Sequence, residues 1–249
     1  MRLSLPGYAR IESARASGIA LETCRGEIES ILTAETVYDF AARQPDARKF
    51  NGRAPVYAIP LGACGNMVVR RSMRGGAFAS LHTDLFLPPT RGLRELIAAM
   101  RLRAVGIPTP EVAAFVTYPA GAILRRSDVI TREVGGDDLG ALLTPSMSAD
   151  RRANALTAAA TLVASLSKAG AHHPDLNLRN ILVDRADSNH AWVLDVDRIR
   201  FHVPGDPIVA RANADRLERS LRKRRDLGEI AITDDEINAL RASPLESGK

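Results

Sequence analysis

Hydrophobic and polar positions in the first half of the chain mostly follow the short alternation of strands. Two runs with long apolar stripes are instead spaced as helices, Gly26–Arg43 and Gly92–Val105. Strands are predicted at four places: Ala54–Pro60, Asn66–Arg71, Val112–Tyr118 and Ala122–Arg132. The glycines at 75 and 76 are expected to end the second of these strands.

The second half has a different pattern, dominated by helical spacing. Arg151–Ala169 carries a continuous apolar stripe and ends at Gly170, which favours a capped helix. A polar loop and two short strands follow, Ile181–Asp184 and Ala191–Val196. Two further helices are predicted, a basic one at Asn213–Arg225 and a last one that opens with Thr233 and Glu236 as a capping box.

This order places most strands before most helices, which is typical of an α+β protein in two lobes. The connector Glu133–Asp138 contains two glycines and is the best boundary in the chain. We therefore expect a lobe at residues 1–133, mostly antiparallel sheet with helices, and a mainly helical catalytic lobe at residues 134–249. A chain of 249 residues is long enough for this arrangement.

Composition narrows the class of protein. The formal net charge is +5, with arginine supplying most of the excess, which favours anionic partners or reflects a GC-rich genome. Cys24 and Cys64 are far apart and have no CxxC spacing, so we expect buried structural cysteines in a reducing compartment. No signal-peptide pattern is present, and the longest uncharged stretch, Ala153–Ser167, is too short to span a membrane. A cytoplasmic or peripheral protein is expected.

The strongest chemical motif is H-P-D-L-N-L-R-N-I-L-V, from His173 to Val183. Its spacing is that of a kinase catalytic loop, H-x-D-x-x-x-x-N followed by an apolar strand. Phosphoryl transfer needs a carboxylate that orients the attacking hydroxyl and accepts its proton, and Asp175 is placed for that role. Asn180 is the predicted neutral oxygen ligand for Mg²⁺, and His173 is expected to support the loop.

A second carboxylate, Asp195, follows in the sequence V-L-D-V-D. Its position fits the aspartate that joins Mg²⁺ to the phosphates of ATP, because hard cations prefer oxygen ligands. Each of these residues alone could simply cap a turn or end a strand, whereas their joint order favours a kinase. A metal site made of His172, His173 and Asp175 is the alternative, and it lacks a fourth ligand at suitable spacing.

Weaker signals in the first half concern nucleotide binding. Gly62 and Gly65 could let backbone amides approach phosphate, or could form a hairpin turn. Arg70 stands where kinases place the strand lysine, and it keeps the charge with a different geometry. Glu95, on the following helix, could pair with Arg70 or lie on an exposed face.

Four segments together resemble the bacterial 3-deoxy-D-manno-octulosonic acid (Kdo) kinase group of the lipopolysaccharide kinase family. They are VVRRSMRGG (68–76), PDLNLRNILV (174–183), LDVDRIRF (194–201) and RLERSLRK (216–223). The resemblance implies a protein-kinase-like fold and transfer of the ATP γ-phosphoryl group to the 4-hydroxyl of Kdo on a lipid A precursor. It assigns the catalytic role to Asp175 and metal binding to Asn180 and Asp195. The chain departs from the group at Val196, where phenylalanine is usual.

The resemblance implies ATP and Mg²⁺ as cofactors and a glycolipid of the Kdo-lipid A type as acceptor. A basic cluster, Arg216, Arg219, Arg222, Lys223, Arg224 and Arg225, could hold the protein peripherally at the anionic cytoplasmic face of the inner membrane, or could be a solvated helix face. No nucleic acid is expected, because aromatic platforms do not accompany the charge. The open alternatives are a kinase of another sugar such as a core heptose and a nucleotide-binding pseudokinase. A protein substrate is disfavoured, because no A-P-E motif follows Asp195.

Overall fold

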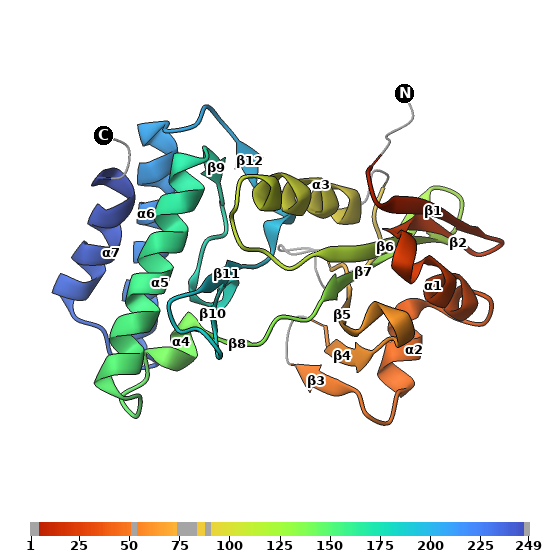
Figure 1. Cartoon of the computed structure of the whole chain (residues 1–249), viewed down its shortest axis with the longest axis horizontal. Coiled ribbons are helices and arrows are strands. Elements are labelled where there is room, and N and C mark those ends of the chain that lie inside the picture. The colour runs from red at the N-terminus through yellow and green to blue at the C-terminus, as the bar shows by residue number, and fades with distance from the viewer. Residues whose placement is uncertain (1–4, 51–53, 74–83, 88–90, 247–249) are drawn as a thin grey trace. The chain divides into compact units, whose positions relative to one another are not determined.

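The computed structural model describes residues 5–50, 54–73, 84–87 and 91–246 (Figure 1). The chain forms two compact units. Unit 1 comprises Met1–Ile97 and Glu111–Glu133, and unit 2 comprises Ala98–Pro110 and Val134–Lys249. The change at Glu133 coincides with the expected lobe boundary, but Ala98–Pro110 groups with unit 2 instead of unit 1. The continuous division at residue 133 therefore stays a prediction.

Unit 1 is built on a seven-stranded antiparallel sheet with the strand order β1-β2-β6-β7-β5-β4-β3. The strands are β1 (Tyr8–Ser13), β2 (Ala16–Leu21), β3 (Arg48–Phe50), β4 (Val56–Pro60), β5 (Asn66–Arg71), β6 (Val112–Ala120) and β7 (Leu124–Arg132). The last four confirm the four predicted strands, and β1 to β3 lie in segments to which the sequence assigned no strand. The predicted end of β5 at Gly75 and Gly76 lies outside the described residues.

The helix predicted over Gly26–Arg43 is wrong as a single element. It consists of α1 (Arg25–Leu32) and α2 (Val37–Arg43), which lie beside the sheet of unit 1 (Figure 1). Thr36 is the reason for the break, because its backbone is extended and its hydroxyl accepts a hydrogen bond from the Asp39 amide. An N-cap of this kind starts a new helix after a turn.

The core of unit 1 lies where α1 and α2 meet the sheet. Its largest fully buried side chains include Ile11, Ile28, Ile59 and Met67. Cys24 and Cys64 are buried in the same core, as expected for structural cysteines. Burial raises the pKa of the Cys64 thiol to about 12, so the thiol stays protonated and unreactive at neutral pH.

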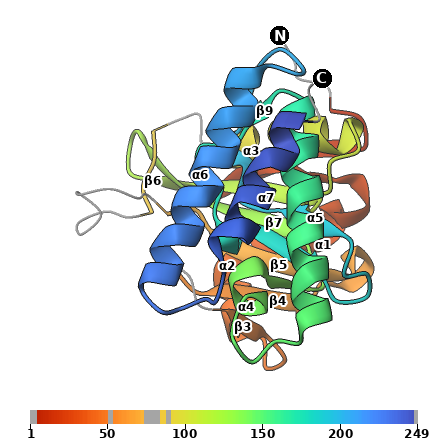
Figure 2. The same cartoon turned by 90° about the vertical axis from the view of Figure 1, so that its left-hand side faces the viewer.

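The helix α3 (Arg91–Ala104) matches the helix predicted at Gly92–Val105 and divides between the two units after Ile97. The rest of unit 2, as far as residue 246, contains four α-helices and small sheets. The helices are α4 (Leu139–Leu142), α5 (Ala149–Lys168), α6 (Pro207–Asp226) and α7 (Asp234–Glu246). The strands are β8 (Gly136–Asp138), β9 (Ala171–His172), β10 (Ile181–Asp184), β11 (Ala191–Val193) and β12 (Arg200–Phe201). In both views α5, α6 and α7 lie side by side (Figure 2).

The helix α6 begins six residues before the predicted start at Asn213, because Asp206 caps it and Pro207 occupies its first turn. The predicted capping box of α7 is confirmed. The Thr233 amide donates to Glu236 Oε2 at 2.7 Å, and the Glu236 amide donates to Thr233 Oγ1 at 3.2 Å. Both helix starts therefore follow from local side-chain hydrogen bonds.

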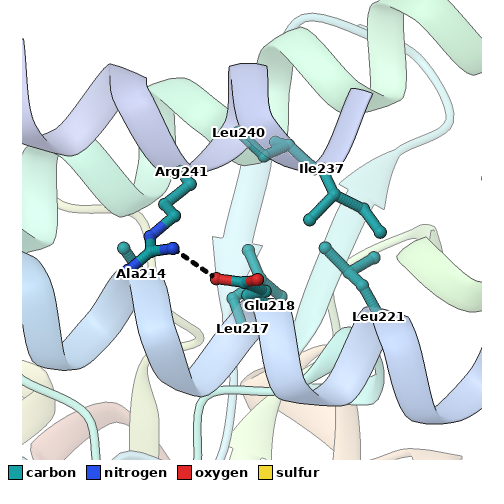
Figure 3. Close-up of a pocket in the computed structure, with 7 residues that line it drawn as sticks. All are labelled: Ala214, Leu217, Glu218, Leu221, Ile237, Leu240 and Arg241. Carbon is teal, nitrogen blue, oxygen red and sulfur yellow. Dashed lines mark ion pairs between the residues drawn. The ribbon is translucent and has the colours of Figure 1, made fainter. Parts of the chain in front are cut away.

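The contact between α6 and α7 is an apolar seam with a charged end (Figure 3). Leu217 and Leu221 of α6 lie against Ile237 and Leu240 of α7, and all four are buried. Leucines at such positions contribute about 2–5 kcal/mol each relative to alanine. Arg241 of α7 closes the seam through its ion pair with Glu218. This packing fixes α6, which also carries the buried Asn213.

Candidate active site

His173 connects the two ends of the predicted catalytic loop in unit 2. The ring is fully buried, and its Nε2 lies 3.0 Å from the carbonyl oxygen of Leu194. Its Nδ1 accepts a hydrogen bond from the Asp175 amide at 3.3 Å. A neutral ring with the proton on Nε2 satisfies both contacts, and burial lowers the pKa of His173, which favours that form. With both nitrogens engaged, the alternative of a metal site built on His173 finds no support.

The backbone of Asp175 is held from three sides. Its amide contacts His173, and its carbonyl oxygen accepts hydrogen bonds from Asn177 Nδ2 at 2.7 Å and Asn180 Nδ2 at 2.9 Å. The Asn180 carbonyl in turn accepts a hydrogen bond from the Leu194 amide at 2.9 Å. These contacts bring three predicted site residues, His173, Asp175 and Asn180, next to the residue that precedes Asp195.

Asn213 of α6 supports this loop through hydrogen bonds to its backbone. The sequence alone did not predict this residue as part of the site. Its side chain is fully buried, with Oδ1 accepting from the His173 amide at 2.9 Å and Nδ2 donating to the Ala171 carbonyl at 3.0 Å. It sits on the apolar stripe of α6 between Ala210 and Leu217. An amide side chain among buried apolar positions was the sequence signal that could have revealed it.

Asp195 does not end a strand as predicted, because β11 stops at Val193. Its backbone is left-handed, with φ 57° and ψ 50°, and among the described residues it alone has a positive φ without being glycine. Such a conformation costs energy, and non-glycine residues that adopt it cluster at active sites and ligand-binding sites. The exposed carboxylate makes no capping hydrogen bond to the turn that follows.

The chemistry of Asn180 and Asp195 fits Mg²⁺. The amide nitrogen of Asn180 is engaged with Asp175, so its oxygen is left to act as a ligand, and Asp195 supplies a carboxylate. Mg²⁺ commonly binds through one or two protein oxygens and completes its shell with water and phosphate. The described residues contain no group of three histidines, cysteines or carboxylates, so a metal held wholly by such side chains is not indicated there.

The carboxylate of Asp175 has a partner that the sequence did not reveal. Arg198 Nη1 lies 2.5 Å from Asp175 Oδ2, and 55% of the Arg198 side chain and 37% of the Asp175 side chain are exposed. Arg198 ends the short turn η4 (Val196–Arg198) that follows Asp195. The predicted catalytic carboxylate is therefore paired, at the surface, with a guanidinium from the segment that carries the second metal ligand.

In unit 1 the predicted pair of Arg70 and Glu95 is formed. The guanidinium of Arg70 on β5 contacts the carboxylate of Glu95 on α3, and Glu95 is buried. Arg71 points to the opposite side of the strand and pairs with the fully buried Asp128 at 3.2 Å. Arg70 is thus the cation associated with α3, as expected from its position, while Arg71 belongs to the interior of unit 1.

Gly62 and Gly65 lie in the turn η2 (Gly62–Cys64) between β4 and β5. The amides of Cys64 and Gly65 donate to carbonyls of the same turn, and a Cβ at Gly62 would lie 2.0 Å from the Glu27 carboxylate. These contacts favour the hairpin interpretation of the glycines, since a neighbouring carboxylate repels phosphate. Their part in nucleotide binding stays a prediction.

The basic cluster of α6 is largely paired within unit 2. Arg222 and Arg225 both contact Asp234, Arg224 contacts Glu229, and Arg216 donates to the Pro174 carbonyl. The basic cluster of α6 is therefore in large part a network of ion pairs with the start of α7 and with the segment before it.

Comparison with known proteins identifies the family. The model of the lipopolysaccharide kinase (Kdo/WaaP) family matches residues 49–243. The chain belongs to this family. The family match includes every predicted site residue, from Gly62 to Asp195.

Curated relatives of this chain carry the name 3-deoxy-D-manno-octulosonic acid kinase. The relative from Stenotrophomonas maltophilia (strain R551-3) is 32% identical over 191 residues, which cover 74% of this chain and 71% of the relative. The relative from Xanthomonas oryzae pv. oryzae (strain PXO99A) is 31% identical over 171 residues, covering 65% of this chain and 64% of the relative. The chain thus spans just under two thirds of the length of the latter.

A solved structure, described as WaaP in complex with acyl carrier protein, has a similar fold. Its TM-score is 0.54 with 14% sequence identity, and the match covers 88% of this chain and 86% of that one. The predicted α+β, protein-kinase-like fold is thereby confirmed. Among the described residues, no helix has both the length and the apolar character needed to cross a membrane.

Proposed function

We propose that the chain transfers the γ-phosphoryl group of ATP to a hydroxyl of Kdo on a lipid A precursor, in the biosynthesis of the lipopolysaccharide core. By family resemblance the acceptor is the 4-hydroxyl. Membership of the lipopolysaccharide kinase family and the names of the two relatives support this activity. The observation that carries the proposal is the clamped loop, in which His173, Asn177 and Asn180 fix the backbone of Asp175.

In the proposed reaction Asp175 orients the acceptor hydroxyl and accepts its proton. The hydroxyl oxygen forms a bond to the γ-phosphorus, the bond from that phosphorus to the β–γ bridging oxygen breaks, and ADP leaves. His173 and Asn213 keep the loop in place while Asp175 acts. Such positioning accounts for much of the catalysis in phosphoryl transfer, because little covalent chemistry is required of the protein.

The remaining roles concern the nucleotide. Asn180 and Asp195 would hold Mg²⁺, which neutralises phosphate charge when bound. Arg70, oriented by the buried Glu95, is proposed to bind phosphate oxygens, for which its planar guanidinium is suited. Gly62 and Gly65 belong to the same proposal, although the amides of Cys64 and Gly65 in their turn already donate to carbonyls.

We also propose that unit 2 contacts an anionic membrane surface peripherally, at the turn between β12 and α6. Val203 and Ile208 flank this turn and are 74% and 75% exposed. The Gly205 amide donates to the Lys168 carbonyl at 3.0 Å, which places the basic end of α5 at the turn, and Arg211 is exposed one helical turn after Ile208. Apolar side chains beside cations are suited to an anionic lipid interface.

The test is transfer of radiolabelled γ-phosphate with purified protein, Mg²⁺ and ATP. The acceptors are Kdo-lipid A, a heptosylated core lipid and a generic protein substrate. Label on Kdo-lipid A alone is the expected result. Label on the heptosylated lipid alone would move the acceptor to another core sugar, and ATP binding without transfer to any of the three would support the pseudokinase.

A further inference from the structure

Arg198 is the feature of the site that the proposed reaction leaves unexplained. A kinase needs the Asp175 carboxylate to meet the acceptor hydroxyl, yet one of its oxygens is already bound to Arg198 Nη1 at 2.5 Å. Both side chains are partly exposed, and pairs of this kind are weak and exchange readily with other ions. The pair is therefore suited to a site in which another anion replaces Asp175 as the partner of Arg198.

The backbones on both sides of this pair are fixed. Asp175 is held by His173, Asn177 and Asn180, as described above. Arg198 follows Val196, which is buried, in a turn closed by the hydrogen bond from the Ile199 amide to the Val196 carbonyl at 3.1 Å. These backbone hydrogen bonds do not involve the two charged side chains, so Arg198 can exchange partners while the bonds persist.

The proposed acceptor provides such an anion. An octulosonic acid carries a carboxylate at neutral pH, and a guanidinium binds a carboxylate through two parallel hydrogen bonds. The acceptor must lie against Asp175 for its hydroxyl to be activated, and among the described residues Arg198 is the cation paired with Asp175.

We propose that Arg198 binds the carboxylate of the acidic sugar acceptor and that this exchange frees Asp175 for the attacking hydroxyl. The inference rests on the proposed function, since it takes the acceptor from it. An acidic sugar then activates the base by its own binding, whereas a neutral sugar leaves Asp175 paired. Arg198 is in this way a specificity-determining residue. A guanidinium here could also meet the transferring phosphate of ATP, and the experiment separates the two anions.

The experiment compares two forms of a short-chain Kdo-lipid A acceptor, the free acid and its methyl ester, with four proteins. These are the unaltered chain, Arg198→Gln, Arg198→Lys and the control Arg200→Gln, which removes an exposed guanidinium two residues away. The unaltered chain and the control should prefer the acid in kcat/KM by about 10- to 100-fold, the range expected for a charged hydrogen-bonded contact. Arg198→Gln should lose the preference, because the KM for the acid rises and the ester meets an unpaired Asp175, and Arg198→Lys should keep part of it.

Binding of the two acceptors without ATP, measured by calorimetry, tests the inference independently of turnover. Arg198→Gln should bind acid and ester alike, whereas Asp175→Asn should bind the acid at least as tightly as the unaltered chain, because its Arg198 is released. If the chain binds the acid with the predicted dependence on Arg198 and transfers no phosphate, the proposed function fails, while the contact between Arg198 and the acceptor carboxylate stands. An acid preference that persists in Arg198→Gln overturns the inference. If Arg198→Gln loses kcat/KM equally for the acid and the ester and has a raised KM for ATP, the inference is overturned as well. Arg198 then binds the phosphate of ATP.

Discussion

At the scale of single residues, the site depends on one carboxylate held by a rigid backbone. We predict that Asp175→Asn lowers kcat by at least about 100-fold, since the amide cannot accept the proton of the acceptor hydroxyl. The shape of the side chain and the loop hydrogen bonds are kept, so ATP binding should be unchanged. The radiolabel assay and a nucleotide-binding titration measure the two properties. Asp187→Asn, in the exposed loop after β10, is the matched control, and full activity of Asp175→Asn would remove Asp175 from its role.

Asn213 should matter through stability and loop position. Replacement by alanine leaves the His173 amide and the Ala171 carbonyl buried without a partner, which we expect to lower the free energy of unfolding by about 1–3 kcal/mol. Chemical denaturation measures this change. Asn154→Ala on the exposed side of α5 should change it by less than about 0.5 kcal/mol. Equal effects of the two substitutions would show that the buried hydrogen bonds of Asn213 carry no special weight.

His173 predicts a dependence of stability on pH. Burial lowers the pKa of His173 below its usual 6.5, so below pH 6.5 the unfolded chain binds a proton that the folded chain does not. The free energy of unfolding should be constant above that pH and should fall as the pH decreases, by up to about 1.4 kcal/mol per pH unit. Burial also lowers the pKa of His172, so this residue adds to the decrease of the free energy of unfolding at low pH.

Unfolding by denaturant between pH 5 and 8 measures this dependence. In His173→Gln the free energy of unfolding should fall less toward low pH than in the unaltered chain. The reason is that the unfolded variant lacks the imidazole that would bind the extra proton. The control is Asn189→Gln in the exposed loop before β11, which removes no titrating group and should keep the original profile. A His173→Gln profile identical to that of the unaltered chain would contradict the prediction.

Sequence spacing located Asp175, Asn180 and His173 because the catalytic loop is a local motif. It could not locate Asn213 or Arg198, whose contacts with the loop span 40 and 23 residues of the chain. Such contacts depend on how α6 and the η4 turn pack, and packing does not appear in local periodicity. The pairing of Arg70 with Glu95 was open between two interpretations for the same reason.

At the scale of elements, predictions succeeded where a pattern was long or capped. The stripe of α5 and the capping box of α7 gave the right elements, whereas the hairpin of β1 and β2 was missed and the break between α1 and α2 was not seen. The predicted strand through Asp195 failed because its apolar residues Leu194 and Val196 continue the pattern after the backbone has turned. A left-handed residue leaves no mark in hydrophobicity.

The turn between β12 and α6 provides the test for membrane contact at this scale. The double substitution Val203→Asp and Ile208→Asp should reduce binding to vesicles that contain anionic lipid, since it adds charge at two exposed apolar positions. Leu227→Asp is the control. Leu227 is 60% exposed and lies at the other end of α6, about 30 Å along a helix of 20 residues. Vesicle flotation measures binding, and equal losses in both proteins would remove the turn from its proposed role.

At the scale of the whole molecule, the positive charge available to bind an anionic surface is smaller than the number of arginines suggests. The chain has 34 basic and 29 acidic residues, and several arginines of α6 are committed to ion pairs. On the proposal of membrane contact, a net charge of +5 should nevertheless attract the chain to an anionic surface, with about 1 kcal/mol for each basic residue that reaches it. Attraction of this kind is long-ranged and screened by salt, unlike the contacts that position Asp175.

Long-range attraction to an anionic surface and direct contacts at the site should therefore differ in their dependence on ionic strength. Raising salt from about 0.1 M to about 1 M shortens the screening length from about 10 Å to about 3 Å. Phosphorylation of acceptor in anionic vesicles should then fall several-fold, while the ratio of acid to ester turnover in a short-chain acceptor should fall less, because the Arg198 contact is direct and short. Neutral vesicles carrying the same acceptor are the control and should show little change. Equal salt dependence on neutral and anionic vesicles would mean that net charge does not bring this chain to its substrate, and apolar contact at Val203 and Ile208 would then have to account for any membrane binding.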